Sequence, residues 1–106
     1  MNVISRKKLR QFYESSTERK RHAATFEYWF KLTRLAKWHA FQDAKALFGQ
    51  TDVVKDTRSG RTAAVFDIGG NKYRVVTQID YLRQTVFISR VLDHKEYDRN
   101  SWKKDI

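Results

Sequence analysis

The sequence predicts an α+β fold in which N-terminal helices pack on a small, mainly antiparallel C-terminal sheet. Up to about residue 48, apolar residues recur at helical spacing, whereas from residue 51 onward short runs of β-branched and aromatic residues alternate with turn signals. The links between those runs are short, which favours antiparallel neighbours, because a parallel crossover needs about a dozen residues or more. Because the chain is short, residues 1–106 are expected to form one domain.

A first helix is expected to begin after Ser5, whose hydroxyl can cap it, and to run to about residue 13. Leu9, Phe12 and Tyr13 form one apolar stripe at helical spacing, so this face should be buried. The other face is basic and carries Arg6, Lys7, Lys8 and Arg10.

Two further helices are expected before the sheet begins. Ser15 and Glu18 have the three-residue separation of a capping box, which predicts a long second helix over about residues 18–38. Its apolar face is broader than a surface helix needs, so it should pack on the sheet. A third helix is expected over residues 41–48, ended by Gly49 in the left-handed conformation.

Strands are expected over residues 53–54, 62–66, 73–79 and 85–91, with turns at residues 58–60, 69–71 and 80–83. Strict alternation along the last strand groups Arg90 with Val86 and Ile88. If the helices cover the more apolar face, we expect Arg74 to face outward, with Arg90 as a second candidate. Together they would form a cationic floor beside His94.

The charge balance points to a polyanionic partner. The chain carries 22 Lys and Arg residues against 12 Asp and Glu residues, a net charge of +10, and 14% of its residues are aromatic. Positive charge attracts phosphates, and aromatic rings interleaved with it can stack on unpaired bases. RNA is therefore the expected partner, although a basic surface without any ligand is the plainer interpretation.

The composition excludes several other classes of protein. Without cysteine there are neither disulfides nor thiolate metal sites, and the three histidines, at positions 22, 39 and 94, are too scattered to form a ligand set, so no metal and no cofactor are expected. No apolar stretch approaches the roughly 20 residues of a membrane-spanning helix. We therefore expect a cytoplasmic protein without a membrane partner.

Reactive side chains follow the last expected strand directly, in the segment His94-Lys95-Glu96-Tyr97-Asp98. Cleaving RNA without a metal needs a base for the 2′-hydroxyl proton, an acid for the departing 5′-oxygen and a cation for the phosphorane charge. His94 is a candidate for either proton transfer, Tyr97 could orient the substrate or donate a proton, and Glu96 or Asp98 could fix the imidazole. One of these carboxylates could instead be structural.

Cations near this segment are candidates for phosphate binding. Arg74 and Lys72 could hold phosphate oxygens, and Arg90 and Lys95 could contact RNA. The plainer interpretations are a cross-strand ion pair for Arg74 and solvated charges for the others. Likewise, His94 could be an ordinary surface residue, and the ring of Tyr97 could simply pack on Trp102.

Two stretches together resemble a known family. Residues 66–76 read Phe-Asp-Ile-Gly-Gly-Asn-Lys-Tyr-Arg-Val-Val, and they are followed by the segment at residues 94–98. This combination resembles the HigB-type toxins of bacterial type II toxin–antitoxin modules, relatives of the RelE group. The Gly-Gly-Asn part alone is an ordinary hairpin turn signal. Where similar toxins commonly have Asn, this chain has Asp67, which we expect to face away from the cleft.

The resemblance implies an RelE-like fold and a metal-independent, ribosome-associated mRNA endonuclease that blocks translation in the bacterial cytoplasm. It also implies inactivation by a HigA-type antitoxin with a helix-turn-helix domain, so that DNA would be contacted only through the antitoxin complex. The motif carries His94, Glu96, Tyr97, Asp98 and Arg74 into the site without assigning their individual roles. A non-catalytic basic RNA-binding or ribosome-binding protein stays open as the alternative.

Overall fold

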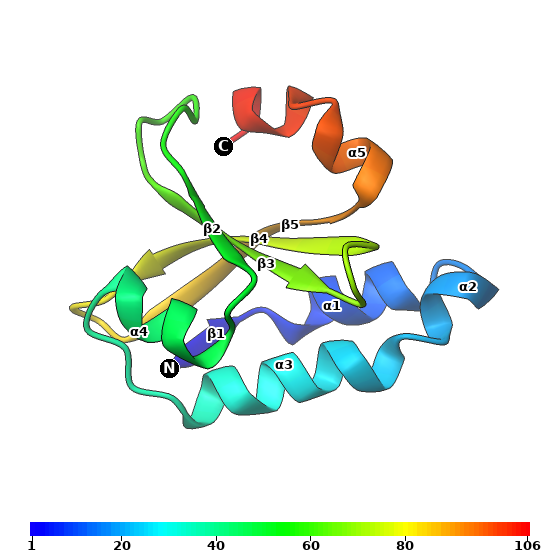
Figure 1. Ribbon diagram of the computed structural model, residues 1–106, viewed down its shortest axis with the longest axis horizontal. Helices are drawn as coiled ribbons and strands as arrows, with labels where there is room; N and C mark the ends of the chain where they lie inside the picture. The colour runs from blue at the N-terminus through cyan, green and yellow to red at the C-terminus, as the bar shows by residue number, and fades with distance from the viewer.

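The α+β fold is confirmed by the computed structural model, which describes residues 1–106. A five-stranded sheet in the order β1-β5-β4-β3-β2 lies between two layers of helices (Figure 1). Its strands are β1 (Asn2–Ile4), β2 (Thr51–Val54), β3 (Ala63–Ile68), β4 (Tyr73–Asp80) and β5 (Thr85–Asp93). The helices are α1 (Arg6–Tyr13), α2 (Thr17–Lys20), α3 (Ala23–Leu35), α4 (Phe41–Leu47), α5 (His94–Asp98) and the 3-10 helix η1 (Ser101–Lys104).

The sheet is mainly antiparallel, as expected, because strands β2 to β5 follow one another as a meander. The exception is β1, which pairs in parallel with β5 at one edge. The sequence pattern did not predict β1, since three residues are too few to show alternation and its partner lies at the other end of the chain.

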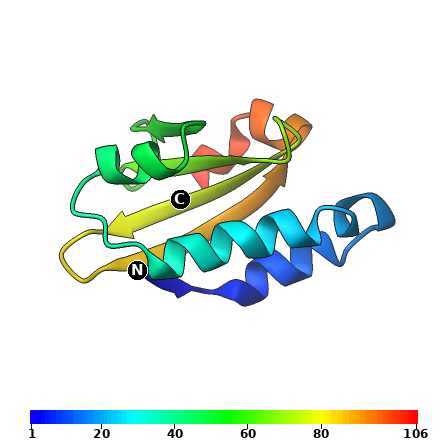
Figure 2. The ribbon, with the colours of Figure 1, turned by 60° about the horizontal axis from the view of Figure 1, so that its bottom comes forward.

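Helices α1 and α3 run side by side across one face of the sheet (Figure 2). The stripe of Leu9, Phe12 and Tyr13 is buried there, as predicted. Phe26 and Trp29 of α3 are also buried, and the ring of Trp29 meets that of Phe66 edge to face at 5.2 Å between centroids. Aromatic packing of this kind adds to the free energy gained by burying the rings, so this layer forms the main core.

The predicted long second helix is wrong, because the chain forms two helices separated at Arg21 and His22. The N-cap of α2 is Ser16, whose side chain accepts a hydrogen bond from the Arg19 amide, rather than Ser15. The ring of His22 packs edge to face on Tyr73 at 5.0 Å. This contact lies where the two helices meet.

The end of the helical region also differs from the expectation. Helix α3 ends at Leu35, and Ala36 has an extended backbone, so Trp38 is buried from a connecting segment instead of a helix. Helix α4 ends where Phe48 becomes extended, and Gly49 does not adopt a positive φ angle. The predicted left-handed cap at Gly49 is therefore wrong.

A smaller layer covers part of the opposite face of the sheet, where α5 and η1 lie (Figure 1). Its apolar cluster consists of Ala63, Val65, Val76, Leu92 and Trp102. Trp102 is almost fully buried and anchors η1 to the sheet. None of the helices has the length and apolar character needed to cross a bilayer.

A β-bulge decides which residues of β5 face this smaller layer. Val76 pairs with Arg90 while Thr77 pairs with Ile88, so Ser89 is the extra residue on β5. Alternation is interrupted there, and Arg90 lines the same face as Leu92 instead of sharing the face of Ile88. The predicted grouping of Arg90 is thus wrong, and the bulge is what turns this arginine toward the α5 side.

Candidate active site

The start of helix α5 is fixed by a capping box. Asp93 accepts a hydrogen bond from the Glu96 amide at 2.8 Å, and Glu96 accepts one from the Asp93 amide at 3.1 Å. Arg19 of α2 adds ion pairs to both carboxylates, at 3.1 Å to Asp93 and 3.4 Å to Glu96. Glu96 therefore fits the structural carboxylate that the sequence left open, and the carboxylate beside the His94 imidazole is Asp98.

Replacing Asp93 with alanine is expected to lower the free energy of unfolding by roughly 1–2 kcal/mol at neutral pH, the usual loss for an N-cap. Burial alone would raise the pKa of Asp93, but hydrogen bonds from Glu96 and the charge of Arg19 outweigh it and lower this pKa. A lowered folded pKa gives stability that is complete above the unfolded pKa and lost as pH falls through the folded value. Urea unfolding from neutral to acidic pH should show that the difference in free energy of unfolding between Asp93→Ala and wild type becomes smaller in acid.

The matched control is Asp98→Ala on the same helix, because Asp98 is exposed and pairs only with His94. An exposed pair of this kind contributes less than about 1 kcal/mol. If the loss of stability in Asp93→Ala stays constant down to strongly acidic pH, the ionised Asp93 side chain is not the source of that stability.

Tyr97 lies in a stack at the centre of the α5 side. Its ring is parallel to that of Trp102, with centroids 5.4 Å apart and 17° between the planes, and the indole N–H of Trp102 donates to the Tyr97 carbonyl. The guanidinium of Arg74 lies 5.1 Å from the centroid of the Tyr97 ring. Burial raises the pKa of Tyr97, Asp52 adds to this rise and Arg74 opposes it. The phenol is therefore protonated at neutral pH and can donate.

Arg74 forms the ion pair that the plainer interpretation anticipated. Its guanidinium lies 3.2 Å from the Asp67 carboxylate, and the two side chains are only 12% and 13% exposed. Asp67 pairs directly with Arg74 across the β3–β4 hairpin, so the expectation that it faces away is wrong. The same carboxylate accepts a hydrogen bond from the backbone amide of Asn71 at 2.9 Å and so helps to hold the turn.

That turn is the predicted hairpin turn rather than a phosphate-binding loop. Gly69, Gly70 and Asn71 have φ angles of 70°, 61° and 71°, a region that glycine and asparagine tolerate best. A turn of residues 69–72 places Ile68 opposite Tyr73 and therefore Asp67 opposite Arg74. The pair could have been found by counting outward from this turn.

His94 is the first residue of α5 and faces solvent, with 58% of its side chain exposed. Its Nε2 atom lies 3.0 Å from the carboxylate of Asp98, one turn later on the helix. When Nε2 donates to Asp98, Nδ1 is left as the proton acceptor. The pair thus combines an accessible base with the carboxylate that orients it.

The predicted open cationic floor is corrected by the positions of the basic residues. Arg74 is neutralised by Asp67, and the ammonium of Lys72 lies 3.7 Å from Glu18 of α2. The segment's own Lys95 is exposed. Arg90 is exposed and faces the α5 side because of the bulge. The basic residues therefore lie at separate positions around the site, and Arg74 is the most buried of them.

Most of the sequence matches a protein-family model. The model describes the HigB toxin, the RelE-like toxic component of a toxin–antitoxin system, and it matches residues 22–100. The chain belongs to the HigB toxin family. The match to the HigB model includes the β3–β4 hairpin and all of α5, and hence Asp67, Arg74, His94 and Tyr97.

Individual relatives of the HigB family are similar over a shorter stretch. The chain is 47% identical over 34 residues to the mRNA interferase toxin HigB of Escherichia coli K12 and to the mRNA interferase HigB of Escherichia coli O157:H7 and of Shigella flexneri. The aligned part is 32% of this chain and 33% of each relative.

The structure adds one positioning residue outside the HigB match that the sequence did not single out. Arg19 ties α2 to the start of α5, and its guanidinium also lies 4.1 Å from the ring centroid of Phe12. In the sequence it is one of three consecutive basic residues, Arg19, Lys20 and Arg21. No local signal distinguishes it from its neighbours, since its two carboxylate partners are more than 70 residues away.

Proposed function

We propose that this toxin cuts mRNA at the site formed by His94, Tyr97 and Arg74. The observation that carries the proposal is the grouping of a protonated phenol, a guanidinium against its ring and an exposed imidazole–carboxylate pair around a single short helix. These groups supply an acid, a cation and a base, the three requirements for cleaving RNA through its own 2′-hydroxyl.

In the proposed reaction, Nδ1 of His94 takes the proton of a ribose 2′-hydroxyl, and the 2′-oxygen attacks the adjacent phosphorus. The bond from phosphorus to the 5′-oxygen of the next nucleotide breaks, and Tyr97 gives its proton to that oxygen. The products are a 2′,3′-cyclic phosphate and a free 5′-hydroxyl. Arg74 stabilises the negative charge that develops on the phosphorane, and Asp98 stabilises the imidazolium.

No step of this scheme uses a metal ion, because side chains carry both protons and the balancing charge. The mRNA substrate is supported by the names of the HigB relatives, which are called mRNA interferases. We infer that the ribosome presents the message, that the reaction takes place in the bacterial cytoplasm and that the whole chain acts as one domain. Control by a HigA-type helix-turn-helix antitoxin, and contact with DNA only through it, belong to the same proposal.

A second candidate function is a non-catalytic, basic RNA-binding or ribosome-binding protein. The ion pair between Arg74 and Asp67 favours it, because a neutralised and mostly buried arginine has less charge to offer a phosphorane. Charge alone would then hold the protein on RNA. The two candidates differ in whether single substitutions in α5 remove cleavage.

Replacing His94 with alanine is expected to slow mRNA cleavage by about 100-fold, the lower end of the range for general bases. The lower end applies because Asp98 stays in place and can take the proton less efficiently. The exposed position of His94 leaves the fold intact. Cleavage is measured by mapping RNA ends on ribosomes translating a defined message.

The matched control is His39→Ala, an exposed histidine outside the site, which should cleave at the wild-type rate. Growth arrest after expression of each variant should be weakened by His94→Ala and unchanged by His39→Ala. Equal cleavage by wild type and His94→Ala would remove His94 from the mechanism and favour the binding protein.

A further inference from the structure

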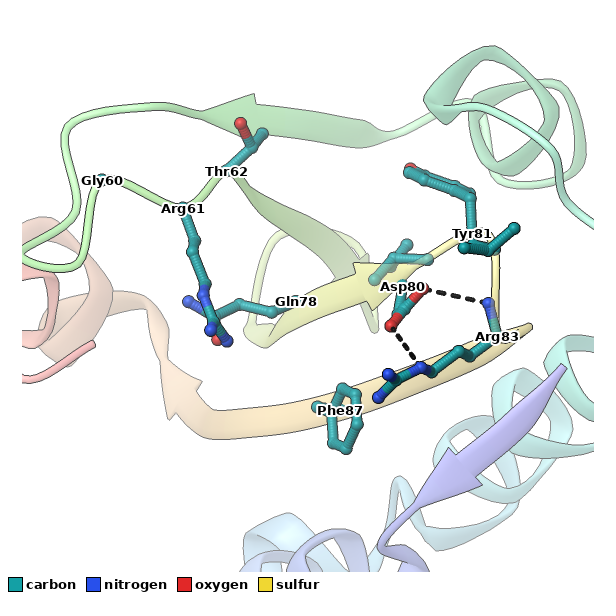
Figure 3. A pocket seen from close by; sticks show the side chains of 10 residues that line it. Gly60, Arg61, Thr62, Gln78, Asp80, Tyr81, Arg83 and Phe87 are labelled. Atoms are coloured by element: carbon teal, nitrogen blue, oxygen red, sulfur yellow. Dashed lines mark hydrogen bonds and ion pairs between the residues drawn. The ribbon is translucent and has the colours of Figure 1, made fainter.

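A groove of about 800 Å³ opens on the α5 side of the sheet, at the opposite end of β4 and β5 from α5 itself. One wall is the loop between β2 and β3, which contributes Arg61, and the other is the β4–β5 hairpin, which contributes Arg83. Figure 3 shows Phe87 and Gln78 between these walls. Neither α5 nor η1 contributes a residue to its lining.

The floor of this groove is a cross-strand pair of unusual composition. Gln78 of β4 lies directly opposite Phe87 of β5. Phe87 is 43% exposed although it sits within a strand, and no hydrogen bond joins the side-chain amide of Gln78 to the residues drawn around it in Figure 3. An exposed ring beside a free amide provides a stacking surface and a hydrogen-bonding group for one base.

The cations of the groove are also largely uncommitted. The guanidinium of Arg61 forms no ion pair or hydrogen bond, and Arg83 keeps only a 3.9 Å contact with Asp80 at 82% exposure. By contrast, Arg74 and Arg19 are both held by carboxylates. Arg61 is therefore free to bind a phosphate.

The groove continues toward the proposed active site. Gln78 and Phe87 also line a second hollow of about 370 Å³ that includes Arg90, and Arg90 lines a third hollow, of about 140 Å³, together with Trp102. Gln78 follows Arg74 by four residues on β4, a separation of about 13 Å along a strand. A short stretch of extended single-stranded RNA can therefore reach from Gln78 in the groove to Arg74 in the proposed active site.

We propose that this groove binds the part of a single-stranded RNA that lies next to the cleaved linkage. One base stacks on Phe87 and hydrogen-bonds to Gln78, while Arg61 and Arg83 hold the flanking phosphates. The inference rests on the proposed function, because it requires the bound RNA to continue past Arg90 to Tyr97. RNA is favoured over a peptide because free cations flank a ring that can stack on a base.

The test measures the affinity of the full chain for a short, labelled single-stranded RNA of mixed sequence, in a Tyr97→Phe background that keeps the RNA intact. Phe87→Ala is expected to weaken binding by roughly 5- to 100-fold, the loss of one base–aromatic stack. Phe87→Tyr, which keeps the ring, should bind like the parent. Arg61→Ala should weaken binding and reduce the slope of log affinity against log salt by about 0.7, as for one phosphate on a single strand.

Arg10→Ala is the matched charge control, because Arg10 is an exposed arginine without an ion pair on α1, across the sheet from the groove. It removes the same charge and should leave the affinity nearly unchanged. Thermal unfolding of each variant shows that the fold is retained, and Arg61 lies in an exposed loop where substitution does not disturb the core.

The outcomes separate this inference from the proposed function. If Phe87→Ala and Arg61→Ala bind RNA like the parent, the groove is not an RNA site, whether or not the wild-type protein cuts mRNA. Loss of antitoxin binding with unchanged RNA affinity would assign the groove to the protein partner and overturn the inference. If both variants lose RNA affinity while wild type never cuts mRNA, the groove stands and the proposed nuclease fails.

Discussion

Tyr97→Phe is expected to reduce mRNA cleavage by roughly 1,000- to 10,000-fold, the upper part of the range for a general acid. Phenylalanine keeps the ring that stacks on Trp102 and packs against Arg74, so the fold of the α5 side is preserved. It removes the only phenol in the α5 segment, and the neighbouring Arg74 cannot replace it as an acid because a guanidinium does not release its proton near neutral pH. The departing 5′-oxygen would therefore leave as an unprotonated alkoxide.

The measurement is single-turnover cleavage of a message bound to ribosomes, with RNA affinity measured in parallel. Unchanged affinity together with lost cleavage identifies a chemical role for the hydroxyl. Tyr28→Phe is the matched control, since Tyr28 is a 62% exposed tyrosine on α3 and should behave like wild type. If Tyr97→Phe cuts as fast as wild type, another group must donate the proton.

Arg74→Ala is expected to lose cleavage by roughly 100- to 1,000-fold, as when one charge-stabilising donor is removed from an active site. It should also unfold more easily, by about 3 kcal/mol, because the largely buried Asp67 carboxylate is left without its cation. The single variant alone cannot separate these two effects.

The double variant Asp67→Asn with Arg74→Ala separates them. With both charges removed, most of the lost stability should return, while cleavage stays low. Asp67→Asn alone frees Arg74 and is expected to cut at least as fast as wild type. Urea unfolding measures the stability, and the ribosome cleavage assay measures the activity. A stable double variant that cleaves at the wild-type rate would show that Arg74 has only a structural role.

The strand region could be predicted well from the sequence, and the helical region less well. The meander follows from local signals, since β-branched runs separated by turn residues fix both the strands and their antiparallel order. Around the break between α2 and α3, His22 contacts Tyr73 and Arg19 contacts Asp93, and these partners are distant in the sequence. Helical periodicity does not register such contacts, so the two helices were predicted as one.

The site residues were predicted as a group, but their arrangement was not. The segment at residues 94–98 indicated the chemistry because its side-chain types are visible in the sequence. Glu96 caps the helix through Asp93, and the three-residue separation of these two residues is a local capping-box signal that the interpretation of the segment did not use. The side of the sheet that Arg90 faces depends on the bulge at Ser89, which has no local signature.

In the proposed reaction, RNA is cut through its own 2′-hydroxyl and Tyr97 protonates the leaving oxygen. The most direct measurement is the chemical identity of the new ends in mRNA cut by the wild-type protein on translating ribosomes. We predict a 5′-hydroxyl on the downstream fragment and a 2′,3′-cyclic phosphate, or the 3′-phosphate formed from it, on the upstream fragment. A 5′-phosphate opposite a 3′-hydroxyl would mean that water or another nucleophile attacked the phosphorus, and it would contradict the mechanism.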